Sequence, residues 1–170
     1  PSAPVFQPRL PPLLLIELAL QVGRELHAIG KLNAAFDGFR QRTFECTGLI
    51  LNAPEFAVDP ELKGKFRIRM RGIVACEVAC AGAASQVLDG ILTSLDSLLE
   101  KRSPEFIDDI LTRRTLDRFD KEAPELVSAV VPGIISVTQL TEILRGLAAE
   151  KLSFRNFDLI LQAIAETGGK

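Results

Sequence analysis

The sequence predicts an α+β fold in which a small mixed α/β lobe precedes an all-helical lobe. Residues 65–71 alternate between charged and apolar side chains, as a strand with one buried face does. After residue 84 the apolar side chains recur every three or four positions, which is the period of an amphipathic helix. This change of period predicts a mixed subdomain over residues 13–80 and a helical subdomain over 85–166. Five prolines predict a proline-rich, extended linker over residues 1–12.

Short apolar or alternating runs predict the strands of the mixed lobe, and one amphipathic run predicts a helix. The helix covers residues 31–46, where apolar side chains share one face, and Gly48 ends it. Five runs are expected to form strands: residues 13–18, 49–51, 55–58, 65–71 and 73–79.

The helical lobe is predicted from its apolar stripes and from residues that favour helix starts. Pro124 suits the first position of a helix that ends before Pro132. Serine and threonine at a helix start accept a hydrogen bond from a free backbone amide. On this basis four helices are expected to begin at or near Ser85, Thr112, Ser136 and Ser153.

The composition excludes several classes of protein. The chain has 170 residues, of which 47% are hydrophobic and 25% charged, as in a globular domain. Its net charge of −2 argues against nucleic acid as the main partner, because a polyanion needs a positive excess. Three cysteines at no regular spacing do not indicate a disulfide framework. No run approaches the ~20 apolar residues of a membrane span.

Residues that could carry chemistry are few and scattered. His27 is the only histidine, and no nucleophile lies near it in the sequence. Cys76 and Cys80 do not have zinc-ligand spacing, and buried apolar positions explain them better. The pair Asp108–Asp109 is expected to be a solvated turn. The sequence therefore predicts no enzyme, no metal and no cofactor.

One concentrated charge pattern remains, on the strand at residues 65–71. Alternation places its four cations on one face. An exposed strand face or a charged, aggregation-resistant edge is the simpler interpretation. The functional interpretation is a docking surface for an acidic partner or for membrane headgroups. The candidate partner-binding residues are Lys65, Arg67, Arg69 and Arg71.

The helical half resembles a known family. Residues 130–140 read VVPGIISVTQL and lead into ILRGLAAEK at 143–151; LSFRN at 152–156 then precedes ILQAIAE at 160–166. This pattern of two helices and the turn between them resembles the cytoplasmic domain of the export-gate proteins of type III secretion and flagellar assembly, the FHIPEP family. Residues 67–75, RIRMRGIVA, resemble that family's first cytoplasmic subdomain more weakly.

The resemblance implies a non-enzymatic export-gate component at the cytoplasmic face of the bacterial inner membrane. In the family, nine subunits form a ring that receives export substrates and chaperones. Exposed residues around the turn are then candidates for subunit contact: Glu150, Arg155 and Asn156. Asn156 stands where the family pattern has an aspartate.

Two departures from the family pattern leave an alternative open. The family's membrane helices and a subdomain expected after the basic strand are missing, so we expect a shortened cytoplasmic piece. The alternative is a stand-alone adaptor derived from the same domain, which has lost ring formation and export. The sequence does not distinguish a flagellar from an injectisome system.

Overall fold

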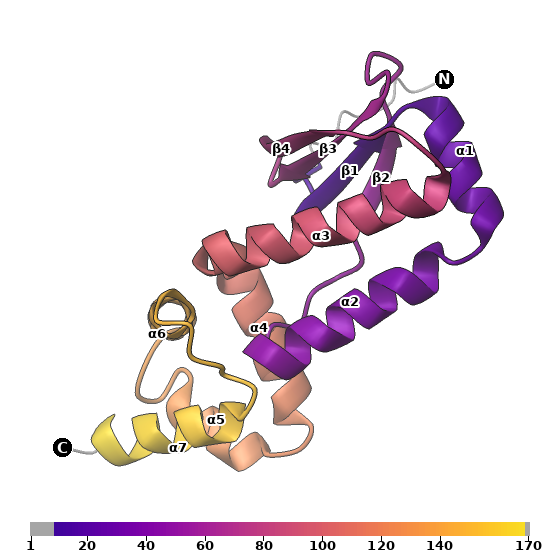
Figure 1. Cartoon of the computed structure of the whole chain (residues 1–170). Helices are drawn as coiled ribbons and strands as arrows, with labels where there is room; N and C mark the ends of the chain where they lie inside the picture. The colour runs from indigo at the N-terminus through magenta and orange to yellow at the C-terminus, as the bar shows by residue number, and fades with distance from the viewer. Residues whose placement is uncertain (1–8, 169–170) are drawn as a thin grey trace, which may run out of the picture. The chain divides into compact units, whose positions relative to one another are not determined.

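The computed structural model describes residues 9–168 and confirms the α+β class (Figure 1). Its strands are β1 (Leu14–Leu18), β2 (Glu55–Val58), β3 (Lys65–Met70) and β4 (Ile73–Ala79). Its helices are α1 (Leu20–Ile29), α2 (Leu32–Thr47), α3 (Ala84–Arg102), α4 (Asp109–Asp120), α5 (Pro124–Val130), α6 (Val137–Ala149) and α7 (Phe157–Gly168), with a 3-10 turn η1 (Ser103–Phe106). Most of the expected linker lies outside the described residues, and residues 9–12 have no regular structure.

The chain divides into two compact units. Among the described residues, the sheet unit comprises residues 9–32 and Ala53–Ile91, and the helical unit comprises Asn33–Asn52 and residues 92–168. This division differs from the expected subdomains, because α2 belongs to the helical unit and the first turns of α3 belong to the sheet unit.

The sheet has the order β2-β1-β3-β4, with β2 parallel to β1 and the other neighbours antiparallel. One face is apolar and buried, as the alternation in β3 predicts. The first turns of α3 cover it, and the Phe66 ring lies 3.4 Å from the position that a Cβ would take at Gly90. The side chains that form this face are Leu14, Ile16 and Leu18 from β1 and Phe66, Ile68 and Met70 from β3.

Two local expectations for the mixed lobe were wrong. Helix α1 was not predicted, because Gly23 interrupts its apolar pattern and Ala19 provides no side-chain cap. Residues 49–51 do not form a strand. Leu49 and Leu51 are buried, but the Leu51 carbonyl accepts a hydrogen bond from Arg40 Nε at 2.8 Å, so a side chain and not a strand satisfies it.

The helix starts in the helical unit are partly as predicted. Ser136 caps α6 and forms a capping box with Gln139, and Pro124 is the first residue of α5. Thr112 was wrongly expected to cap α4. Asp108 does so, accepting a hydrogen bond from the Leu111 amide at 2.7 Å. The expected solvated turn at Asp108–Asp109 is therefore a helix start. Ser153 does not cap α7, which begins at Phe157.

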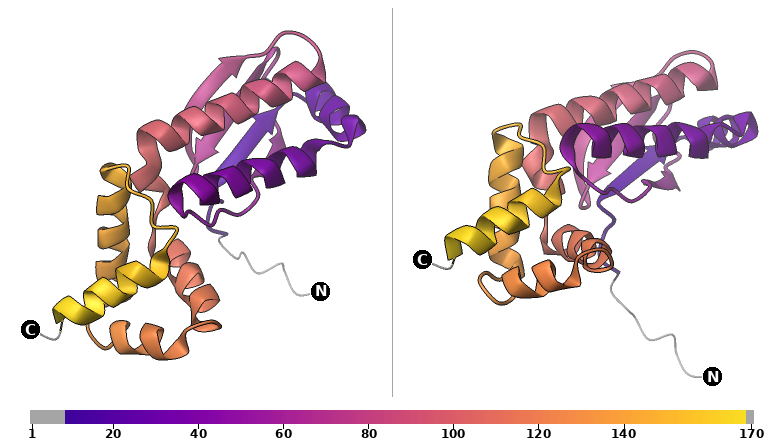
Figure 2. Two further views of the ribbon diagram at one scale, coloured as in Figure 1. Left: turned by 60° about the horizontal axis from the view of Figure 1, so that its bottom comes forward. Right: turned by 90° about the horizontal axis from the view of Figure 1, so that it is seen from below.

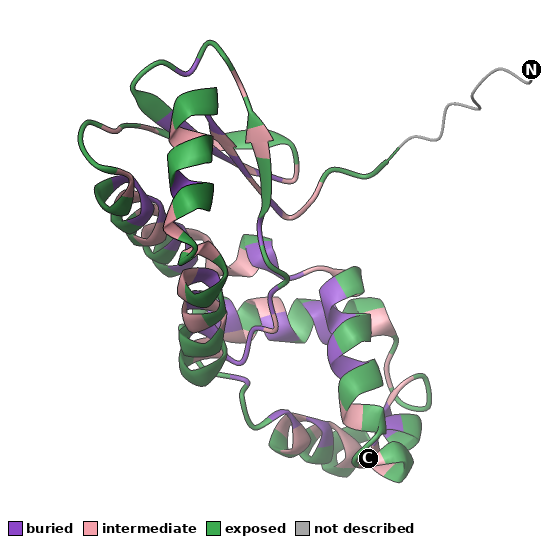
Figure 3. Ribbon diagram, turned by 90° about the vertical axis from the view of Figure 1, so that its right-hand side faces the viewer, coloured by how far each residue is buried: buried purple, intermediate pink, exposed green. Residues whose placement is uncertain are grey.

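The helical unit is built from short neighbouring helices. Helix α5 packs against α4 and α7, while α6 packs against α4 and η1 (Figure 2). Figure 3 shows the buried stripes of these helices in purple. Fully buried members include Phe106, Val130, Leu140, Leu144 and Leu161. No helix in the described part of the chain is long and apolar enough to cross a membrane.

Candidate functional site

The residues with possible reaction chemistry lie apart in the structure. His27 is exposed on α1; Cys76 on β4 and Cys80, just after β4, are half-buried. Burial raises the pKa of both thiols, which disfavours the reactive thiolate. Within residues 9–168, no group of three or more histidine, cysteine or acidic side chains is placed to hold a metal ion.

Three of the four predicted partner-binding cations, Lys65, Arg67 and Arg69, lie on β3 among carboxylates, and we call them the basic row. Strand register places Glu17 of β1 and Glu77 of β4 on either side of Arg67. The guanidinium of Arg67 lies 3.2 Å from Glu17, 3.1 Å from Glu77 and 3.1 Å from Asp59. Arg67 therefore connects three strands and the loop that follows β2.

Neighbouring members of the row are also paired. Lys65 Nζ lies 3.0 Å from Glu77, and Arg69 Nε lies 2.9 Å from Glu17. Hydrogen bonds from Lys65 and Arg67 hold the pKa of the Glu77 carboxyl below its ordinary value. Lys65, Arg67 and Arg69 lie beside three carboxylates, whose charges offset theirs, whereas Arg71 lies in the turn after β3. The electrostatic attraction for an acidic partner is therefore weaker than the sequence suggests.

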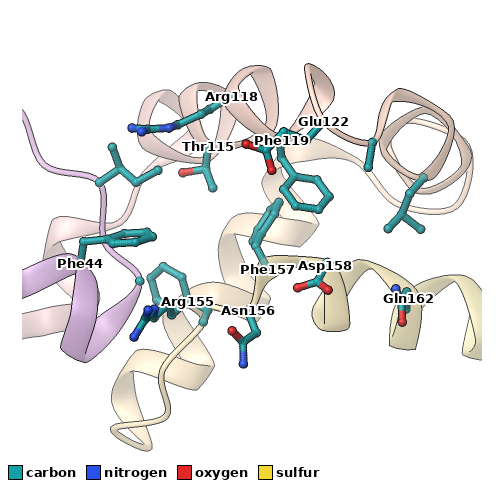
Figure 4. A pocket seen from close by; sticks show the side chains of 15 residues that line it. Phe44, Thr115, Arg118, Phe119, Glu122, Arg155, Asn156, Phe157, Asp158 and Gln162 are labelled. Carbon is teal, nitrogen blue, oxygen red and sulfur yellow. The ribbon is translucent and has the colours of Figure 1, made fainter.

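The helical unit contains a surface pocket. This pocket has a volume of about 580 Å³ and is formed by the end of α2, by α4 and α5, and by the segment that leads into α7 (Figure 4). We call it the Arg155 pocket. Its labelled lining residues in Figure 4 are Phe44, Thr115, Arg118, Phe119, Glu122, Arg155, Asn156, Phe157, Asp158 and Gln162.

Gly48 fixes one wall of the Arg155 pocket. It ends α2 with φ +84° and lies against the backbone of Phe154 and Arg155. The Phe154 amide donates a hydrogen bond to the Thr47 carbonyl at 3.0 Å. Gly48 thus allows the end of α2 and the segment before α7 to meet backbone to backbone, which sets the position of Arg155.

The opposite wall is held by aromatic packing. The rings of Phe119 on α4 and Phe157 on α7 meet edge to face, with centroids 5.7 Å apart. Phe44 of α2 remains 37% exposed at the rim. Phe44 and Phe119 were not predicted as site residues, because neither lies in a motif and their proximity depends on tertiary packing.

The pocket presents charges of both signs. Arg118 and Arg155 supply the cations, and Glu122 and Asp158 supply the carboxylates. Within the described chain, neither arginine side chain forms a hydrogen bond or an ion pair, unlike Arg67. Of the three predicted contact residues, Arg155 and Asn156 line the pocket, whereas Glu150 lies at the carboxyl end of α6 outside it.

Comparison with known proteins identifies the family. The model of the FHIPEP family matches residues 78–170, which is more than half of the chain. The chain belongs to the FHIPEP family. This confirms the resemblance in the helical half, and membership of this family of protein-export components confirms the prediction that the chain is not an enzyme.

Two curated relatives carry the name flagellar biosynthesis protein FlhA. The protein of Salmonella typhimurium is 34% identical over 76 residues, and that of Escherichia coli is 32% identical over 76 residues. Each match covers 45% of this chain but only 11% of the relative. The chain thus matches a small part of these FHIPEP proteins.

Solved structures share the fold over nearly the whole chain. The Chlamydia pneumoniae CdsV protein matches with a TM-score of 0.82 at 17% identity, over 99% of this chain and 66% of CdsV. The SctV-C structure described as nonameric, from EPEC, matches with a TM-score of 0.77 at 15% identity, over 97% of this chain and 62% of that one. The sheet unit therefore belongs to the shared fold, although the family model does not reach most of it.

Proposed function

We propose that this chain is a cytoplasmic part of a type III protein export gate, located at the cytoplasmic face of the bacterial inner membrane. It acts through subunit contacts and through docking of export substrates and chaperones, with no covalent step. The observation that carries the proposal is the FHIPEP match over residues 78–170, which include most of the helical unit and most residues of the Arg155 pocket. Two solved structures with the same fold are described as nonameric, which supports assembly of this chain into a ring.

The Arg155 pocket is the surface that we propose for subunit contact. A ring is built from one face of each subunit meeting a different face of the next, so a recess on one side suits a projection on the other. The unpaired guanidinium groups of Arg118 and Arg155 provide charge for a partner, because no carboxylate of the described chain pairs with them. Interface centres are enriched in arginine and aromatic residues, as this pocket is.

The basic row remains a proposed docking surface, but with a reduced role. Lys65, Arg67 and Arg69 already bind carboxylates of their own sheet, so an acidic partner would have to compete with them. The alternative of a stand-alone adaptor remains a second candidate. An adaptor would keep the same fold, but it would not self-associate, and deleting its gene would not change export.

A secretion assay tests the proposal in cells. The gene is deleted from its own host, and export of secreted proteins into the medium is measured after complementation with the wild-type chain in its natural context or with Arg155→Glu. An export-gate component requires that deletion abolishes export and that wild type restores it, while Arg155→Glu restores much less. Unchanged export in the deletion strain supports the adaptor.

A further inference from the structure

The sheet unit contains a second recess that no function described above uses. Its lining residues come mainly from α1 and the edge strand β2, and its volume is about 500 Å³. Figure 1 shows the positions of these two elements. We call this recess the α1–β2 groove. Its lining is largely apolar and comprises Leu18, Leu20, Gly23, Arg24, Leu26, His27, Leu32, Phe56, Ala57 and Val58.

Several apolar side chains of the α1–β2 groove are exposed to solvent. Leu20 is 49% exposed, Phe56 38% and Val58 54%. Exposed apolar residues that gather around one recess, and are not scattered singly, are typical of a protein interaction site. Hydrophobic burial by a partner would therefore contribute to binding here.

The face of α1 that lines the groove would allow the backbone of a partner to approach the helix closely. Leu20, Gly23, Arg24 and His27 recur at the spacing of one helical face. A Cβ added at Gly23 would meet no atom within 4 Å, so the helix surface is open there. Glycine inside a helix is less favourable than alanine, but it lets another backbone pack closely.

The charge of the groove is of one sign. Arg24 carries a positive charge and His27 offers ring nitrogens for hydrogen bonding. None of the described residues that line the groove is a carboxylate. A partner with acidic side chains beside an apolar face is therefore electrostatically complementary.

From this geometry we propose that the α1–β2 groove binds an amphipathic helix of a partner protein, whose apolar face is flanked by carboxylates. The apolar face covers Leu20, Phe56 and Val58, and the carboxylates meet Arg24 and His27. A helix fits better than an added strand, because β2 has four residues and offers few backbone partners. The groove lies in the sheet unit and the Arg155 pocket in the helical unit, so the two proposals can fail separately.

Peptide binding measured by fluorescence anisotropy tests this proposal. The probe is a labelled helical peptide of about 18 residues with leucines on one face and glutamates on both flanks. The matched peptide has lysines in place of the glutamates. The wild-type chain should bind the glutamate peptide more tightly, and this preference should weaken with salt.

Glycine substitutions separate groove binding from non-specific binding. Gly23→Leu places a side chain in the groove, and its Cβ would meet no atom within 4 Å, so the glutamate peptide should bind at least about tenfold more weakly, or about 1.4 kcal/mol. Gly146→Leu is the matched control, because Gly146 lies inside α6 with no atom within 4 Å and outside the groove. Arg24→Glu should shift the preference toward the lysine peptide. Circular dichroism confirms that each variant is folded.

Three results would overturn the proposal. The first is absence of glutamate-peptide binding at about 100 μM, above the range of specific helix-in-groove complexes. The second is equal binding by the Gly23→Leu and Gly146→Leu chains. The third is a different occupant: a dimer that Gly23→Leu dissociates, or peptide binding only after residues 1–8 are removed.

Discussion

The hydroxyl oxygens of Thr112 and Thr141 lie 2.8 Å apart and join α4 to α6 inside the helical unit. Both side chains are buried, with Thr112 fully inaccessible. Each hydroxyl also lies 3.0 Å from a carbonyl of its own helix, that of Asp108 or Val137. The pair therefore fixes the positions of α4 and α6 relative to each other.

Thr112→Val and Thr141→Val should each lower the free energy of unfolding by about 1 kcal/mol, because each removes the bond between the helices. The double variant should lose less than the sum, since the two residues share one interaction. Thr115→Val is the control, because Thr115 is buried on α4 but bonds only to the Leu111 carbonyl of its own helix. Urea unfolding measures these four variants and wild type, and additive losses would contradict the account.

Asp109 should make the helical unit sensitive to acid. Hydrogen bonds from Thr141 and Thr138 lower the pKa of its carboxyl, and Thr138 Oγ1 lies 2.7 Å from it. A carboxyl whose pKa is lower in the folded state stabilises the fold above its unfolded pKa of about 4. This contribution is lost as the pH falls through the folded-state pKa. Asp109→Asn should be less stable than wild type at pH 7, and the difference should shrink in acid. A constant difference in unfolding midpoint across this pH range would be the contrary result.

Gly48→Ala tests how the Arg155 pocket is built. The new methyl group would overlap the Arg155 nitrogen and the Phe154 carbonyl carbon, at a φ that side chains rarely adopt. Strain and overpacking should together lower the free energy of unfolding by at least about 2 kcal/mol. Gly64→Ala is the control, because Gly64 also has positive φ but open space around it. Equal losses in the two variants would show that the close contact with Arg155 does not matter.

Arg67→Met should destabilise the sheet, because it leaves Glu17, Asp59 and Glu77 close together without their shared cation. The unfolding midpoint should fall at pH 7 and recover in part at acidic pH, where the carboxyls are protonated. Arg114→Met on the exposed surface of α4 should change little. If both variants match wild type, the network contributes nothing to the sheet.

The sequence predicted the elements whose signals are local. Ser136 and Gln139 form a capping box four residues long, and β3 shows its buried face by alternation alone. The pairing of Arg67 could not be predicted, because it depends on the register that sets Glu17 and Glu77 beside it. For the same reason the Arg155 pocket was not predicted, although Arg155 and Asn156 were named as candidates for subunit contact. Gly48 was recognised as a helix end, but its contact with Arg155 joins segments far apart in the chain.

Sedimentation velocity over a wide concentration range tests the central claim most directly, because it measures self-association without any other component. Three proteins are compared: wild type, Arg155→Glu, and Arg114→Glu as a charge-matched control on exposed α4. We expect wild type and Arg114→Glu to form larger species as concentration rises, while Arg155→Glu remains monomeric. A wild-type chain that stays monomeric throughout, or an Arg155→Glu chain that associates as wild type does, would contradict subunit contact through the Arg155 pocket.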